Sequence, residues 1–68
     1  MLLLINGEQR ELPQGTMVAG VVESMRGHPD ARGVAVAVDG EVVPRSSWDA
    51  TELSAGAHVE IVVAVQGG

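Results

Sequence analysis

Two uninterrupted apolar runs, residues 1–5 and 61–65, constrain the fold of this chain more than any other feature. A strand with one face in water alternates apolar and polar residues, whereas a strand covered on both faces can be apolar throughout. We therefore expect the two runs to be central strands that lie side by side in one sheet. A helix would cover one face of that sheet.

The composition limits how so short a chain can be stabilised. It has 68 residues, no cysteine and a single aromatic residue, Trp48. Disulfides are excluded, so aliphatic side chains must form the core of a single domain, which we place at residues 1–64. A lone tryptophan in such a chain is expected to be a packing anchor rather than a recognition residue. The lack of a thiol also excludes persulfide or thioester chemistry on a side chain of this protein.

Two dipeptides, Asn6-Gly7 and Asp39-Gly40, predict hairpin turns. Both suit type I′ turns, in which the two central residues have positive φ. The strands that these turns would join are residues 1–5 and 8–12, and residues 34–38 and 41–43. With a last strand at residues 59–65, the order is hairpin, helix, hairpin, strand. This order predicts an α+β fold with a mixed sheet of about five strands packed on one helix.

A helix is expected at residues 17–26. Four apolar residues have the i, i+3, i+4 and i+7 spacing of one helical face, namely Val18, Val21, Val22 and Met25. Thr16 is expected to cap the N-terminus with its hydroxyl, and Gly27 and Pro29 are expected to end the helix. Residues 45–57 are polar and are expected to be irregular.

One face of the sheet is expected to remain uncovered, because alternate residues of a strand point to opposite faces. The side chains predicted to point toward the helix are Met1, Leu3, Ile5, Val59, Ile61 and Val63. The side chains predicted to point away from it are Leu2, Leu4, Val62 and Ala64. Exposed apolar patches often mark partner sites, so we interpret these four residues as a partner surface. The alternatives are that residues 45–57 fold over them, or that the patch is small enough to be tolerated in water.

The charge and hydropathy of the chain restrict its partners. The formal net charge is −5, and the chain has no lysine. Nucleic acid is a poor partner for a surface without clustered cations, whereas a basic patch on another protein is a better one. The alternative, of equal weight, is that the acidity only keeps a small protein soluble. No apolar run approaches the roughly 20 residues that cross a bilayer, which predicts no membrane association and a cytoplasmic location. His28 and His58 lack further ligands at metal-binding spacing, so no metal site is expected.

The segment at residues 42–48 reads Val-Val-Pro-Arg-Ser-Ser-Trp, and the sequence finishes with Gly67-Gly68 after the last strand. The segment is similar to the V-P-R-x-x-W segment of the ThiS family, the sulfur carrier proteins of thiamine biosynthesis. Asn6-Gly7, Thr16 at the helix start and residues 59–62 before the glycines support the resemblance, which covers essentially the whole chain.

This resemblance implies a ubiquitin-like β-grasp fold and a sulfur carrier function. In that family a partner enzyme adenylates the C-terminal glycine with ATP, and the product becomes a thiocarboxylate that donates sulfur for thiazole formation. The modified group here would be the Gly68 carboxylate, at the end of a flexible tail formed by Val65, Gln66, Gly67 and Gly68. Glycine suits this role because no Cβ hinders the reacting carbon or the narrow approach to it.

The implied partners are an E1-like adenylating enzyme, a thiazole synthase, and a cysteine desulfurase or other sulfur donor. The chain itself is expected to bind no cofactor, because Gly15, Gly20 and Gly27 do not match a phosphate-binding loop. ATP and Mg²⁺ would be bound by the adenylating enzyme. No nucleophile–base constellation occurs in the sequence, so the chain is expected to be a co-substrate rather than an enzyme.

Three alternatives stay open on the sequence alone. The chain could carry sulfur for another product, such as molybdopterin, cysteine or a secondary metabolite. It could be a non-covalent β-grasp interaction module in which Gly67 and Gly68 are incidental. It could also be a modifier that becomes attached to lysines of target proteins.

Overall fold

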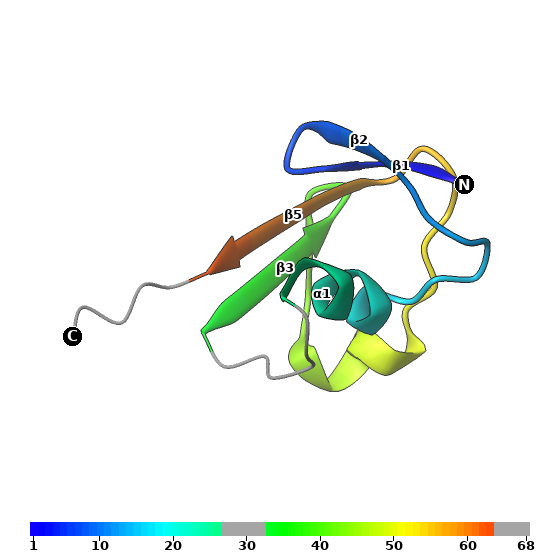
Figure 1. Ribbon diagram of the computed structural model, residues 1–68. Helices are drawn as coiled ribbons and strands as arrows, with labels where there is room; N and C mark the ends of the chain where they lie inside the picture. The colour runs from blue at the N-terminus through cyan, green and yellow to red at the C-terminus, as the bar shows by residue number, and fades with distance from the viewer. Residues whose placement is uncertain (27–32, 64–68) are drawn as a thin grey trace.

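A computed structural model describes residues 1–26 and 33–63 as one sheet with a helix packed on one of its faces (Figure 1). In chain order the elements are β1 (Leu2–Ile5), β2 (Glu8–Glu11), α1 (Val18–Arg26), β3 (Val34–Val38), β4 (Glu41–Val43), the 3₁₀ helix η1 (Arg45–Ala50) and β5 (His58–Val63). The expected order of hairpin, helix, hairpin and strand is confirmed. No helix in the described part of the chain is long and apolar enough to cross a bilayer.

Both predicted hairpin turns are confirmed. Asn6 and Gly7 have φ of 51° and 83°, and Asp39 and Gly40 have φ of 50° and 84°. Two successive residues with positive φ give the type I′ turn, whose twist matches that of the strands it joins. These turns fix β1 against β2 and β3 against β4 as antiparallel pairs.

The sheet is mixed, with the strand order β2-β1-β5-β3-β4. β5 lies at its centre, parallel to β1 and antiparallel to β3. The prediction that the first and last strands are neighbours at the centre of the sheet is therefore confirmed. The two apolar runs themselves are offset, because β1 pairs only with His58 and Val59 of β5, whereas residues 61–63 pair with β3. The backbone N–H of Leu4 donates to Ala57 O at 3.0 Å, and that of Asn6 donates to Val59 O at 2.9 Å. This arrangement, with α1 across one face, is the expected β-grasp fold.

The two edge strands are short, and β2 is polar throughout. All four residues of β2, Glu8, Gln9, Arg10 and Glu11, are exposed. β4 has three residues, and Pro44 follows it directly. Charged side chains and proline on an edge strand discourage pairing with another chain.

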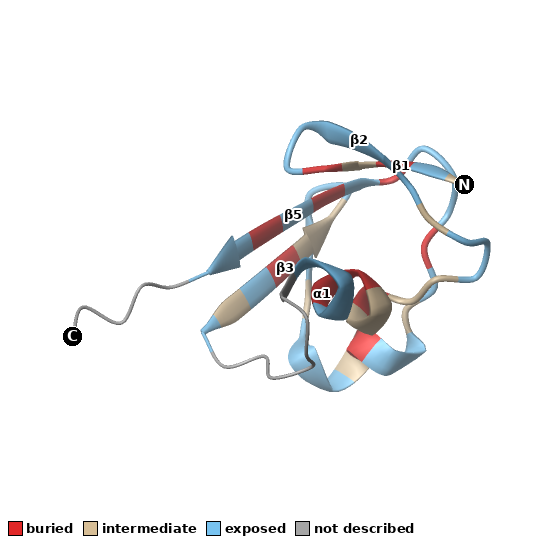
Figure 2. Ribbon diagram, viewed as in Figure 1, coloured by how far each residue is buried: buried red, intermediate tan, exposed pale blue. Residues whose placement is uncertain are grey.

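The core lies between the sheet and α1. Figure 2 shows buried and exposed residues alternating along β5. The buried strand residues are Leu3, Ile5, Val36, Val59 and Ile61, and the buried helix residues are Val18, Val21 and Val22. The predicted helix-facing sets are confirmed for these positions. Aliphatic side chains pack together here, as the composition requires.

Two residues predicted to lie in the core are exposed at the ends of their elements. Met25, in the last turn of α1, is 37% exposed, and Val63, the last residue of β5, is 47% exposed. Figure 1 shows that the end of β5 extends past α1, so the helix does not cover Val63. Periodicity predicts which side of a helix or strand a residue lies on. It does not predict where the element packed against that side ends.

The predicted capping role of Thr16 is wrong. Its hydroxyl donates to Pro13 O at 2.6 Å, within the preceding turn. The Met17 carbonyl accepts the first helical hydrogen bond, from Val21 N at 3.2 Å, and Val18 N donates to Thr51 O at 2.9 Å. The segment after η1 therefore satisfies an amide of the first turn, which a capping side chain would otherwise do. Gly27 and Pro29, the predicted helix end, lie outside the described residues.

The prediction of irregular structure for residues 45–57 is wrong for residues 45–50, which form η1, and is confirmed for residues 51–57. Pro44 precedes η1, and η1 packs on α1 rather than on the opposite face of the sheet. Trp48 from η1 is buried, and its indole N–H donates to Val43 O at 2.8 Å. The packing role predicted for Trp48 is confirmed. The alternative that residues 45–57 cover the outward apolar residues does not hold, because this segment contributes Trp48, Leu53 and Ala57 to the core.

Replacing Trp48 with Phe should lower the free energy of unfolding by about 2 kcal/mol, because the smaller ring leaves a void and the Val43 carbonyl loses its donor. Urea denaturation followed by far-UV circular dichroism would measure this change. Ser46→Ala is the matched control, since Ser46 is an exposed residue of the same 3₁₀ helix. Equal stability of the two variants would contradict the anchoring role.

Candidate functional site

β5 leads directly toward the predicted functional tail, and it is held unequally on its two sides. It pairs with β3 at five positions, from Val38↔Val59 to Val34↔Val63. It pairs with β1 at only two, Leu4↔His58 and Ile5↔Val59. The second half of β5 therefore depends on β3, because β1 turns away at Ile5.

The side chain of Asn6 extends the β1 side of this pairing. Its Nδ2 donates to Ile61 O at 3.2 Å, and its Oδ1 accepts from Ile61 N at 2.8 Å. One side-chain amide thus occupies the positions that the next backbone N–H and C=O of β1 would have taken. Asn6 can do this because asparagine tolerates the left-handed backbone conformation that the turn requires. It fixes β5 two residues before the last described strand residue, Val63.

The face of the sheet opposite α1, which we call the outer face, carries the predicted partner residues. Leu2 and Val62 are 46% and 64% exposed, and Leu4 is half-buried. Their placement on this face agrees with the alternation predicted from the sequence. Ala64, the fourth predicted residue, lies outside the described residues.

These residues do not form the single patch that the sequence predicted. Leu4 is level with His58, so Val62 lies four residues further along β5. At about 3.3 Å per residue the separation is about 13 Å along the strand. Of the outward-facing residues of β5, His58 is at the level of Leu4, and Glu60 lies between that level and Val62. The register of β1 and β5 therefore divides the predicted surface into two parts.

The part around Val62 contains residues that sequence reasoning missed. Val62 is opposite Ala35, and Ala37 is opposite both Glu60 and Val42. Val42 is 72% exposed. Together with Val36, the residues Ala35, Ala37, Val42, Glu60 and Val62 line a hollow, which we call the apolar hollow. The alternation of valine and alanine in β3 was the available signal, since the small residues point outward.

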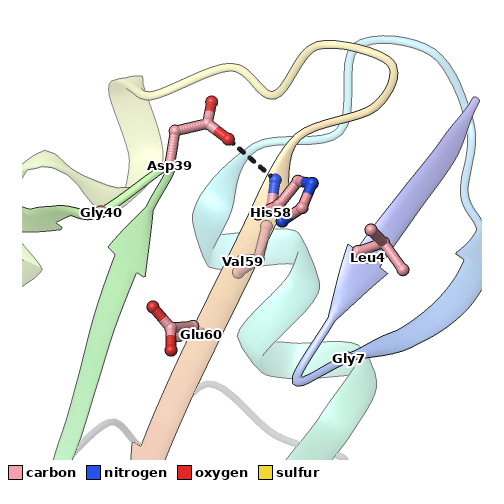
Figure 3. A pocket seen from close by; sticks show the side chains of 7 residues that line it. All are labelled: Leu4, Gly7, Asp39, Gly40, His58, Val59 and Glu60. Atoms are coloured by element: carbon pink, nitrogen blue, oxygen red, sulfur yellow. Dashed lines mark hydrogen bonds between the residues drawn. The ribbon is translucent and has the colours of Figure 1, made fainter.

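The part around Leu4 is more polar, and both hairpin turns contribute to it (Figure 3). We call it the turn hollow. Its lining residues are Leu4, Gly7, Asp39, Gly40, His58, Val59 and Glu60. The backbone N–H of His58 donates to Asp39 Oδ1 at 3.0 Å, and Asp39 N donates to His58 O at 2.8 Å. These bonds join the start of β5 to the β3–β4 turn, so the floor of the turn hollow is fixed by backbone.

The described polar side chains form no metal-binding cluster, and three of the hydroxyls are bonded to backbone. Within residues 1–26 and 33–63, no group of three or more His, Asp or Glu side chains could hold a metal ion. The hydroxyls of Thr16, Ser24 and Thr51 each donate to a backbone carbonyl oxygen of a nearby residue. The predicted reactive residues, Gly68 with Gly67, Gln66 and Val65, lie outside the described residues.

The sequence and the fold of this chain are similar to those of known proteins. The model of the ThiS family matches residues 3–68. The crystal structure of the thiamine biosynthesis protein (ThiS) from Geobacter metallireducens is similar, with a TM-score of 0.73 and 29% sequence identity over the whole of both chains. The solution structure of a thiamine biosynthesis protein from the same organism has a TM-score of 0.80 and 28% identity, covering all of this chain and 88% of the other. No match was found among the curated proteins.

Replacing Asn6 with Gly should lower the free energy of unfolding by about 1–2 kcal/mol, because two hydrogen bonds to Ile61 are lost while positive φ remains accessible. Chemical denaturation would measure the loss, and hydrogen exchange should show faster exchange of the Ile61 amide. Gln9→Ala on the neighbouring strand, where the side chain is exposed, is the control. Unchanged protection of the Ile61 amide in the glycine variant would refute the bridging role.

Proposed function

Because this chain belongs to the ThiS family, we propose that it is a sulfur carrier protein of thiamine biosynthesis whose reactive group is the Gly68 carboxylate. The observation that carries the proposal is that the family model runs through residue 68 and so includes Gly67-Gly68. The two similar structures are both of thiamine biosynthesis proteins, which favours that pathway over other sulfur-requiring pathways.

The proposed chemistry takes place on the tail and uses an enzyme partner. A carboxylate is a poor electrophile, so it must first acquire a leaving group. One Gly68 carboxylate oxygen attacks the α-phosphorus of ATP, pyrophosphate leaves, and an acyl adenylate forms. The outer sulfur of a persulfide on the donor then attacks the carbonyl carbon and AMP leaves, giving an acyl disulfide. A thiol attacks the other sulfur of that disulfide, which forms a new disulfide and releases the thiocarboxylate. An E1-like adenylating enzyme would bind the ATP and Mg²⁺, and a cysteine desulfurase or similar enzyme would supply the sulfur.

The thiocarboxylate would then donate its sulfur to a thiazole synthase. The carrier must reach the active sites of at least two enzymes in this scheme, with its body docked outside each. Residues 64–68 in extended form would span about 16 Å at about 3.3 Å per residue, which is enough to enter a neighbouring active site. The outer face, with Leu2, Leu4 and Val62, is the proposed docking surface. In this scheme the folded domain binds the partner enzymes, and the reaction takes place at the last residue, Gly68.

Deletion of Gly68 should abolish sulfur loading, because the carboxylate then moves to a different position on a shorter tail. The wild type should gain the mass that corresponds to replacement of one oxygen by sulfur when incubated with ATP, Mg²⁺, an adenylating enzyme of thiamine biosynthesis and a sulfur donor. Intact mass spectrometry measures this gain. The deletion removes no residue of the described sheet, so circular dichroism should show a folded domain. Normal loading of the deletion variant would refute the role of Gly68.

Replacing Gly67 with Val should slow loading by about tenfold or more, because a β-branched side chain restricts the backbone and widens the tail. The initial rate of thiocarboxylate formation, followed by the same mass measurement, is the readout. Ala55→Val, which adds a similar side chain at an exposed position remote in sequence from the tail, is the control. Equal rates for the two variants would argue against a narrow channel around the tail.

A further inference from the structure

Glu60 is a carboxylate at the junction of the two hollows of the outer face. It lines both the apolar hollow and the turn hollow. On β5 it is opposite Ala37, whose other neighbour is Val42 on β4. Figure 3 shows its carboxylate on the β3 side of β5, whereas Leu4 lies on the other side. A partner that covers both hollows would therefore also cover Glu60.

Glu60 takes part in neither of the two ion pairs found among the described side chains of residues 1–25 and 33–63. These pairs join the Met1 amino group to Glu11 and Arg10 to Glu8. Arg10 is opposite the buried Leu3, so it is on the face toward α1, and Arg45 begins η1 on the same side of the sheet. Glu60 is exposed, so water solvates its charge while the face is free.

Docking of a partner would remove the water that solvates the Glu60 carboxylate. A carboxylate that loses its water must be paired with a cation or with hydrogen-bond donors. The residues beside Glu60 leave room for such a partner group. Ala35 and Ala37 are small, and Val42 and Val62 form apolar walls around them. A lysine or arginine side chain could lay its methylene stem on these walls while its charged head reaches Glu60.

We propose that the outer face binds a basic side chain of the adenylating enzyme, which pairs with Glu60 while apolar atoms fill the hollow formed by Ala35, Ala37, Val42 and Val62. This inference rests on the proposed carrier function, since it names the chemistry by which that partner recognises the carrier. The net charge of −5 also favours a positively charged partner.

A second copy of this chain is a poorer occupant of the face. In a two-fold symmetric contact the same patch occurs on both subunits. A contact centred on Glu60 would bring two carboxylates together, and like charges at an interface oppose association. The partner must therefore be basic where this chain is acidic.

The test measures binding of purified, full-length carrier variants to an adenylating enzyme of thiamine biosynthesis by titration calorimetry at low and high salt. Glu60→Gln keeps the size of the side chain and removes its charge. It should weaken binding by about tenfold at low salt, and its affinity should fall less with added salt than that of the wild type. Glu23→Gln, an exposed glutamate of α1 on the other side of the sheet, is the matched control and should change affinity by less than about twofold.

Other results would overturn the proposal in distinguishable ways. If Leu4→Glu weakens binding and Glu60→Gln does not, the enzyme uses the outer face without a cation at Glu60. If neither variant weakens binding, the enzyme docks elsewhere. If sedimentation velocity shows a wild-type dimer that Glu60→Arg dissociates, a second copy occupies the face. Sulfur loading of the wild type by the same enzyme is scored separately, so the proposed function can fail or stand independently of this result.

Discussion

The parallel pairing of β1 with β5 is the interaction on which the rest of the fold depends. It joins the first strand of the chain to the last, through the backbone bonds of Leu4 to Ala57 and of Asn6 to Val59. β5 can occupy the centre of the sheet only if the intervening chain crosses over one face, which places α1 there. Among residues 1–26 and 33–63, no element covers the opposite face. The crossover of the chain on one face therefore accounts for both the core and the exposed outer face.

The local features of this fold could be predicted because residue type alone decides them. Asn6-Gly7 and Asp39-Gly40 accept positive φ, and their turns are where the sequence indicates. The strands and the helix followed from periodicity. The capping of α1 could not be predicted in this way, because the first-turn amide of Val18 is satisfied by Thr51, a residue far along the chain. The same holds for η1, a short polar helix that is held in place by burial of Trp48.

The sequence predicted which face of the sheet carries the candidate site, but not how far apart its residues lie. Alternation correctly placed Leu2, Leu4 and Val62 on the outer face, since that depends only on the period of a strand. Their mutual distances depend on register, and a continuous apolar run carries no alternating signal that would specify it. The apolar hollow was missed for a related reason. It needs β3, β4 and β5 to be neighbours in that order, and only the folded sheet shows that Ala35, Ala37 and Val42 adjoin Val62.

The composition of the sheet edges also bears on how concentrated the protein can become. A carrier that keeps one sheet face uncovered for its partners is exposed to unwanted assembly, and open sheet edges are the usual starting points of fibrils. Here one edge is the fully polar strand Glu8–Glu11, and the other is three residues long and stopped by Pro44. Growth of a cross-β stack from either edge would have to bury charge or omit a backbone donor. The edges thus resist the addition of further strands even though Leu2, Val42 and Val62 are exposed on the outer face.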